Sequence, residues 1–227
     1  MKGIGRIISS TKKFDVMNLQ FGLALPAGVY SPGLTYQQTL AGLLGGGTFW
    51  NPITVISWPG PGFPLNSANY SLKNSFGKNT ACSLATFNFG QYYPAGWAGS
   101  PTFVSSAFNL YKAFGYTDYP NPRLTFTNFT PGKYDIIIYN NHGNSGFSIK
   151  NRYSIYNAAN TLLSSVQYNN ANIGSVPTSI ASLVENTHYL RISNITLPQS
   201  FYILLTNTSV QNQVDKPMLN GISFKKL

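Results

Sequence analysis

The side chains that most often do chemistry in enzymes are scarce in this chain: five carboxylates and two histidines in 227 residues. They are Asp15, Asp118, Asp135, Glu185, Asp215, His142 and His188. Glycoside hydrolysis needs two carboxylates about 5–10 Å apart, and no motif joins any two of these acids. A Ser-His-Asp triad needs an activated serine, and no Gly-x-Ser-x-Gly elbow occurs. The sequence therefore predicts a protein without catalytic residues, not an enzyme.

The sequence gives equally little support to a metal or phosphate site. Two isolated histidines do not make a zinc site, and the carboxylates are too few to favour calcium. A single cysteine, Cys82, excludes an intrachain disulfide, and we expect a buried, inert thiol. Gly45-Gly-Gly47 is followed by Thr48-Phe49 rather than by the lysine of a phosphate-binding loop. We expect no cofactor and no metal.

The positive charge is concentrated at the start of the chain. The net charge is +10, and Lys2, Arg6, Lys12 and Lys13 lie in the first thirteen residues, which contain no acid. Residues 1–15 are predicted to form a basic arm that contacts nucleic acid or an acidic protein. A solvated tail is an equal alternative, and so is a strand added to a neighbouring subunit. No apolar run resembles a signal peptide or a membrane span.

The elements that follow the arm are predicted to be strands. Alternating or apolar runs separated by Gly, Pro and Asn clusters recur at the spacing of a β-sandwich. The predicted strands are 16–25, 70–74, 81–89, 123–129, 134–139, 147–155, 161–168, 188–195, 201–207 and 219–224. No second core, linker or repeat is evident. We expect an all-β, antiparallel sandwich in a single domain, residues 16–227.

Residues 91–122 are rich in aromatic residues, Gly and Pro, and are predicted to form a long ordered loop with one helical turn near 105–114. Aromatic rings beside amides suit contact with a glycan or with another subunit. The candidates for that contact are Tyr92, Tyr93, Trp97, Tyr111, Tyr116, Tyr119 and, in an exposed loop further on, His142. His188 is expected at a strand edge.

Several short motifs, taken in order, resemble those of galactose-binding-like jelly-roll domains of bacterial surface and secreted proteins. The strongest are the Gly46-Gly-Thr-Phe-Trp-Asn51 turn, the run Leu124–Tyr139, and the closing Leu219-Asn-Gly-Ile-Ser-Phe224. The resemblance covers about residues 16–227 and implies a jelly roll. The motif residues to which we give structural roles are Trp50, Asn51, Pro131, Gly132, Tyr134, Asp135, Asn220 and Gly221.

Physical roles follow for several of these motif residues. Pro131-Gly132 is predicted to make a tight turn between paired strands, and Asn220-Gly221 to supply a positive φ where the last strand begins. Trp50 is expected to close one end of the sandwich rather than to contact sugar. Asp135 is expected to hydrogen-bond a turn. None of these roles specifies a ligand.

Two functions fit these expectations. The first is a virion structural protein, a capsid, vertex or decoration subunit of a phage, that assembles with itself and other virion proteins through its arm and aromatic loop. Low charge, the basic arm and the single-domain format favour it. The alternative, which the resemblance implies, is a carbohydrate-binding module or lectin-like adhesion protein at the cell surface or outside the cell.

Overall fold

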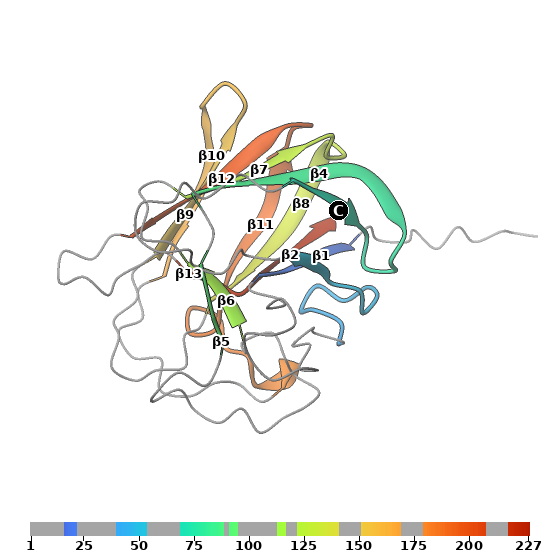
Figure 1. Cartoon of the computed structure of the whole chain (residues 1–227), viewed down its shortest axis with the longest axis vertical. Coiled ribbons are helices and arrows are strands. Elements are labelled where there is room, and N and C mark those ends of the chain that lie inside the picture. Colours follow the sequence, from blue (N-terminus) through green and yellow to red (C-terminus); the bar gives the residue numbers. More distant parts are fainter. Residues whose placement is uncertain are drawn as a thin grey trace, which may run out of the picture.

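The described part of the chain forms two large β-sheets packed face to face and a smaller, three-stranded sheet (Figure 1). The computed structural model describes residues 16–21, 40–53, 69–88, 91–94, 113–116, 122–140, 151–168, 179–207 and 218–227. For 91–94, 113–116, 207 and 218 it describes the backbone alone. The all-β sandwich predicted from the sequence is confirmed, while the basic arm lies outside the described residues.

The first sheet has five strands in the order β11-β8-β14-β1-β2. Their bounds are β1 Val16–Phe21, β2 Asn51–Ile53, β8 Gly132–Tyr139, β11 Tyr189–Leu197 and β14 Gly221–Lys226. All neighbours are antiparallel except β1 and β2, which are parallel. Pro52 lies in β2 at the sheet edge, where a strand tolerates a residue without an N–H donor.

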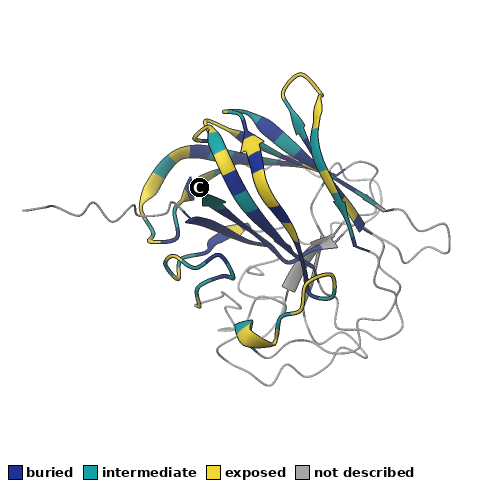
Figure 2. Cartoon of the chain, turned by 180° about the vertical axis from the view of Figure 1, so that it is seen from behind, coloured by how far each residue is buried: buried dark blue, intermediate teal, exposed yellow. Residues whose placement is uncertain are grey.

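The second sheet has six antiparallel strands in the order β10-β9-β12-β7-β4-β3. Their bounds are β3 Asn69–Lys73, β4 Asn79–Phe87, β7 Arg123–Thr127, β9 Asn151–Asn157, β10 Leu162–Gln167 and β12 Phe201–Asn207. A hairpin whose turn lies near residues 76–79 joins β3 to β4. A second hairpin, β9–β10, extends beyond the body of the sandwich and exposes its tip (Figures 1 and 2).

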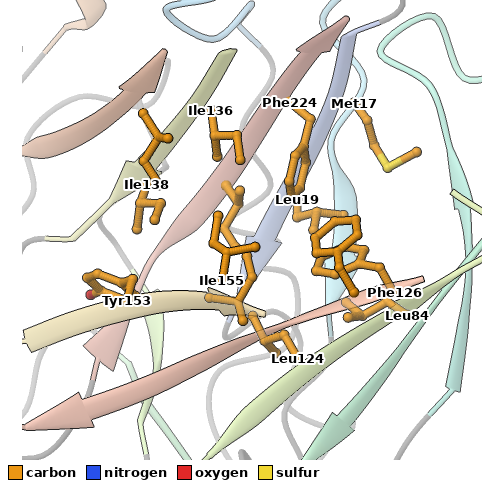
Figure 3. Close-up of a cluster of buried hydrophobic side chains, with 14 of the residues drawn as sticks. Met17, Leu19, Leu84, Leu124, Phe126, Ile136, Ile138, Tyr153, Ile155 and Phe224 are labelled. Atoms are coloured by element: carbon orange, nitrogen blue, oxygen red, sulfur yellow. The ribbon is translucent and has the colours of Figure 1, made fainter. Parts of the chain in front are cut away.

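The core lies between the two sheets and follows from strand alternation. Met17, Leu19, Ile136, Ile138 and Phe224 from the five-stranded sheet face inward (Figure 3). They meet the buried side chains Leu84, Leu124, Phe126, Tyr153 and Ile155 from the six-stranded sheet. The Phe126 and Phe201 rings stack with centroids 4.8 Å apart, in the parallel geometry that aromatic pairs favour.

The prediction that residues 91–122 form a loop with one helical turn was wrong where the structure describes that segment. Strands β5 (Gln91–Pro94) and β6 (Ala113–Tyr116) pair with each other, and β6 also pairs with β13 (Met218–Leu219). Short Tyr- and Phe-containing runs favour strands, and the neighbouring Gly and Pro residues obscured them. Residues 95–112 lie outside the described part of the chain. A 3-10 turn, η1, spans Ile180–Ser182.

Pro131-Gly132 does not join paired strands, contrary to the prediction. Strand β7 belongs to the six-stranded sheet and β8 to the five-stranded sheet, so the turn carries the chain across the core. The Tyr134 hydroxyl donates to the Thr130 carbonyl at 2.6 Å and fixes this corner. Gly132 has φ +154°, and a Cβ there would meet the Lys226 side chain at 2.9 Å.

Asn220-Gly221 also differs from its prediction, because neither residue has a positive φ. Gly221 is extended and lies between Gln20 of β1 and Tyr139 of β8 in the sheet register. The Asn220 N–H donates to the Tyr139 carbonyl at 3.0 Å, and its carbonyl accepts from the Phe21 N–H at 2.9 Å. The pair therefore extends the central ladder instead of making a turn.

The Gly46–Asn51 motif attaches the 40–53 segment to the β3–β4 hairpin. The Gly47 N–H donates to Ser75 Oγ, and the Phe49 N–H donates to the Ser75 carbonyl, both at 2.9 Å. A Cβ on Gly47 would lie 2.1 Å from that carbonyl oxygen, so only glycine fits. Asn51 completes the attachment, since its amide bonds the Asn18 and Lys73 carbonyls and accepts from the Lys73 N–H.

Candidate functional site

The outer faces of the two sheets differ in exposure. In the five-stranded sheet, every residue of β1 is buried on both faces, as are residues 136–139 of β8. In the six-stranded sheet, buried residues alternate with half-buried or exposed ones along β4, β7 and β12 (Figure 2). A surface open to a ligand therefore lies on the outer face of the six-stranded sheet.

A cluster of aliphatic side chains and aromatic rings covers the outer face of the five-stranded sheet. Trp50 is fully buried there against Leu44 and Tyr139, with ring centroids of Trp50 and Tyr139 5.7 Å apart. The Trp50 indole N–H donates to the Leu40 carbonyl at 2.7 Å. The predicted burial of Trp50 is confirmed, but it covers a sheet face instead of closing an end of the sandwich.

A polar network underlies this cluster. The Tyr139 hydroxyl accepts from the Leu43 N–H at 3.0 Å and lies 3.3 Å from Ser223 Oγ, whose one proton is donated to Asn18 Oδ1 at 2.7 Å. Burial raises the pKa of the Tyr139 hydroxyl to about 12, because the phenolate would lose its hydration. These groups are satisfied and structural.

Three rings and one guanidinium form a continuous line across the open face. We call Phe87, Arg123, Tyr202 and Tyr156 the outer row; they come from β4, β7, β12 and β9, four adjacent strands. The Arg123 Cζ lies 5.6 Å from the Phe87 ring centroid and 5.2 Å from that of Tyr202. The Tyr202 and Tyr156 rings stack, with centroids 5.1 Å apart and planes 15° apart.

Strand register produces the outer row. Phe87 is the direct cross-strand partner of Arg123, and Tyr202 is the direct partner of Tyr156. Arg123 pairs with Leu204, which places it diagonal to Tyr202 on the same face. Cation–π contact at a partly exposed site contributes about 0.5–1 kcal/mol. The row is therefore held by its own contacts as well as by the sheet.

Hydroxyl and amide groups flank the outer row. Ser83 and Thr127 hydrogen-bond across β4 and β7 at 2.7 Å, and Ser154 and Ser165 do so across β9 and β10 at 3.0 Å. The Arg152 guanidinium donates to Gln167 Oε1 at 2.8 Å. Both described carboxylate side chains lie elsewhere: Asp135 on β8, and Glu185 3.8 Å from Arg191. The described part of this face thus combines apolar rings, hydroxyls and two cations.

Most residues predicted to bind a partner lie where the structure does not describe their side chains. Lys2, Arg6, Lys12, Lys13, Trp97, Tyr111, Tyr119 and His142 are outside the described ranges. Tyr92, Tyr93 and Tyr116 belong to β5 and β6, where Tyr92 pairs with Gly115. The structure therefore neither assembles these residues into a site nor separates them.

Asp135 makes a structural hydrogen bond, but to a neighbouring strand and not to a turn as predicted. Its Oδ1 accepts from the Asn194 N–H at 2.9 Å. Asn194 has φ +55° and lies in the irregularity of β11 between Ile192 and Ile195. His188 is buried just before β11, and its Nδ1 accepts from the Val184 N–H at 2.9 Å. His188 therefore holds the turn at 184–188, whereas Asp135 holds the irregularity within β11.

The described residues contain no cluster of three or more His, Cys, Asp or Glu side chains that suits a metal. Cys82 is buried as predicted, and desolvation raises the pKa of its thiol to about 12. Beside it lies a cavity of about 50 Å³, also lined by Met17, Phe129 and Phe224. Since one water occupies about 30 Å³, this cavity does not hold a sugar ring. Among these residues no helix is long and apolar enough to cross a membrane.

Sequence reasoning missed the outer row. Its members lie far apart in the chain, and only the pairing of β4, β7, β9 and β12 brings them together. One signal was present: Arg123, Thr125 and Thr127 alternate with Leu124 and Phe126, which predicts a polar outer face with a cation at its end. The rings that contact Arg123 could not be predicted without the strand order.

Comparisons with known proteins found likeness to solved structures only. No family model and no curated protein matches the chain. The C-terminal CBM6 of LamC, a marine laminarinase from Zobellia galactanivorans, is 15% identical; the match covers 62% of this chain and 90% of that one, with a TM-score of 0.32. A family 35 carbohydrate-binding module from Clostridium thermocellum is 12% identical, with coverages of 63% and 92% and a TM-score of 0.34.

A third match is the Arthrobacter globiformis T6 isomalto-dextranase complexed with panose. It is 12% identical and covers 70% of this chain but 23% of that one, with a TM-score of 0.29. Matches at these scores carry no argument about what this chain binds.

Proposed function

We propose that this protein is a non-catalytic carbohydrate-binding β-sandwich whose binding surface is the outer face of the six-stranded sheet. The observation that carries the proposal is the outer row, Phe87, Arg123, Tyr202 and Tyr156, placed on four adjacent strands of an open face. Sugar rings present apolar C–H faces and hydroxyl rims, and they are bound by aromatic surfaces beside hydrogen-bonding groups.

Several properties of this surface support a sugar polymer as the ligand. Phe87 is 48% exposed, so a large apolar ring faces solvent at one end of the row. Ser83 and Thr127 lie on the same face and have hydroxyl lone pairs that accept hydrogen bonds. The row crosses adjacent strands about 4.8 Å apart. It thus offers an extended contact, which suits a chain of sugars more than a single one.

The virion role predicted from the sequence stays a prediction. It depends on the basic arm and on the aromatic side chains of 91–122, and no described contact favours it. The carbohydrate-binding proposal depends on the side chains of the outer row, whose contacts the structure describes.

A glycan microarray with the purified protein tests the proposal. We expect binding to at least one polysaccharide or oligosaccharide class. Replacing Tyr202 by Ala should reduce that signal at least about tenfold, which corresponds to about 1.4 kcal/mol. Phe76→Ala is the matched control, because Phe76 is 54% exposed in the β3–β4 turn, away from the row. An array without hits, or equal loss in both variants, would refute the proposal.

A further inference from the structure

We infer that the glycan recognised by the outer row is acidic, carrying carboxylate or sulfate groups, and that Arg123 is the residue that selects it. This inference rests on the proposed function and specifies its ligand class. The observations that support it are the contacts of the Arg123 guanidinium on the outer face of the six-stranded sheet.

The Arg123 guanidinium is positioned by ring contacts alone within the described part of the chain. It lies over the Phe87 ring on one strand and over the Tyr202 ring on another, at 5.6 and 5.2 Å. No described residue accepts a hydrogen bond from its side chain or forms an ion pair with it. Its neighbour on the same face, Arg152, differs, because Gln167 Oε1 accepts from both its Nε and an Nη.

Among the described residues the Arg123 guanidinium contacts two rings and none accepts a hydrogen bond from it, so its N–H donors remain for a ligand. These donors form a planar fork that matches the two oxygens of a carboxylate or sulfate, whereas an ammonium group has no such geometry. Because Phe87 and Tyr202 restrict the side chain before binding, less rotamer entropy is lost when an anion is bound. Arg123 is thus prepared for a carboxylate or sulfate group presented beside an apolar surface.

The charge of the surroundings agrees with an acidic ligand. The described carboxylate side chains, Asp135 and Glu185, lie on or beside the five-stranded sheet and do not repel an anion at Arg123. Nucleic acid fits less well, since it needs a stripe of cations that follows many phosphates. Arg123, a cation without a hydrogen-bond acceptor among the described residues, lies among rings and hydroxyls, as suits a polymer with an acid group on each sugar.

Affinity gel electrophoresis in 150 mM salt, about physiological ionic strength, tests the inference with matched polymers. The first pair is polygalacturonate and its methyl ester; the second is dextran sulfate and dextran. The two pairs separate carboxylate from sulfate recognition. An oligo-dT of equal charge serves as the nucleic-acid comparison. The variants are Arg123→Lys, which keeps the charge but loses the planar fork, and Arg123→Gln. Lys133→Gln on β8 removes an exposed charge from the other sheet and is the control.

The inference predicts that one acidic polymer retards the wild type at least about tenfold more strongly than its neutral partner. Arg123→Lys should lose most of that preference, and Lys133→Gln should retain it. If acidic and neutral polymers bind equally and Tyr202→Ala abolishes both, the proposed function stands and the acidic specificity is wrong. If Arg123→Gln and Lys133→Gln lose affinity equally, or oligo-dT binds most tightly, the inference is overturned. Binding to no polymer overturns the inference together with the proposed function.

Discussion

The guanidinium of Arg123 lies between two aromatic rings from different strands, 5.2 Å from the Tyr202 centroid and 5.6 Å from the Phe87 centroid. Arg123 is the first residue of β7, which is an inner strand of the six-stranded sheet. Its two ring neighbours reach it from β12 on one side and β4 on the other. This arrangement makes the rings and the cation one surface, so changes to either ring should alter binding without disturbing the core.

Phe87→Ala should weaken glycan binding while leaving the fold almost unchanged. The ring is about half exposed, and its described ring contact is with Arg123. We expect at least about a fivefold loss of affinity, or about 1 kcal/mol, and a change of unfolding free energy below about 1 kcal/mol. Isothermal titration with an array-identified glycan and urea unfolding measure the two quantities. A large stability loss with unchanged affinity would show that Phe87 serves the fold instead.

Gly47→Ala should destabilise the protein far more than Gly45→Ala. A Cβ on Gly47 would overlap the Ser75 carbonyl oxygen at 2.1 Å, whereas a Cβ on Gly45 meets nothing within 4 Å. Gly45 has φ +74°, so its substitution costs only the backbone strain, about 1–2 kcal/mol. Gly47→Ala must displace the attachment at Ser75 and should cost at least about 3 kcal/mol. Chemical unfolding measures both losses of unfolding free energy. Equal losses in the two variants would contradict the close approach of Gly47 to the Ser75 carbonyl.

Asp135→Ala should destabilise β11 by removing the acceptor for the Asn194 N–H. The bond is 2.9 Å long and exposed, so a loss of about 1 kcal/mol or less is expected. Asn194→Gly should be nearly neutral, because glycine adopts the φ of +55° freely. Asn194→Val should cost more than about 1 kcal/mol at the same position. Urea unfolding of the three variants checks this order, and a tolerated valine would contradict it.

Cys82 should be inert to thiol reagents in the folded protein. It is 4% exposed, and burial raises its pKa to about 12, so the reactive thiolate is suppressed at neutral pH. Labelling by iodoacetamide at pH 8 should be at least about a hundredfold slower than in 6 M guanidinium. Mass spectrometry over time measures both rates. Rapid labelling of the native protein would contradict the burial of the Cys82 thiol.

Tyr139→Phe should lower stability at pH 7 and lose that disadvantage in alkali. The variant leaves the half-buried Leu43 N–H without its acceptor, which costs about 1–2 kcal/mol. In the wild type, the folded pKa of about 12 exceeds the unfolded value of 10.0. The stabilisation of the wild type by the protonated Tyr139 hydroxyl is therefore complete below pH 10 and is lost as the pH rises toward 12. The unfolding free energies of the wild type and the variant should therefore differ at pH 7 and nearly agree at pH 11. A difference of the same size at both pH values would contradict this prediction.

The sequence predicted the fold better than the site. The β3–β4 hairpin, the strand through Ile136 and Ile138 and the sandwich class follow from local alternation and turn residues, which act over a few positions. The turn at Pro131-Gly132 was misread because local chemistry makes a turn without specifying whether its strands pair. The outer row depends on contacts between positions as distant as Phe87 and Tyr202, which only strand order determines.

If the open face of the six-stranded sheet binds the glycan, a bulky group attached to that face should block binding. Thr127→Cys places a thiol on that face, and Lys133→Cys places one on β8 of the other sheet; both native side chains are exposed. Each variant is coupled to a polyethylene glycol maleimide, with the buried Cys82 expected to stay unmodified. On the glycan that binds the wild type best, the Thr127 conjugate should lose binding and the Lys133 conjugate should keep it. Full binding by the Thr127 conjugate would contradict the account.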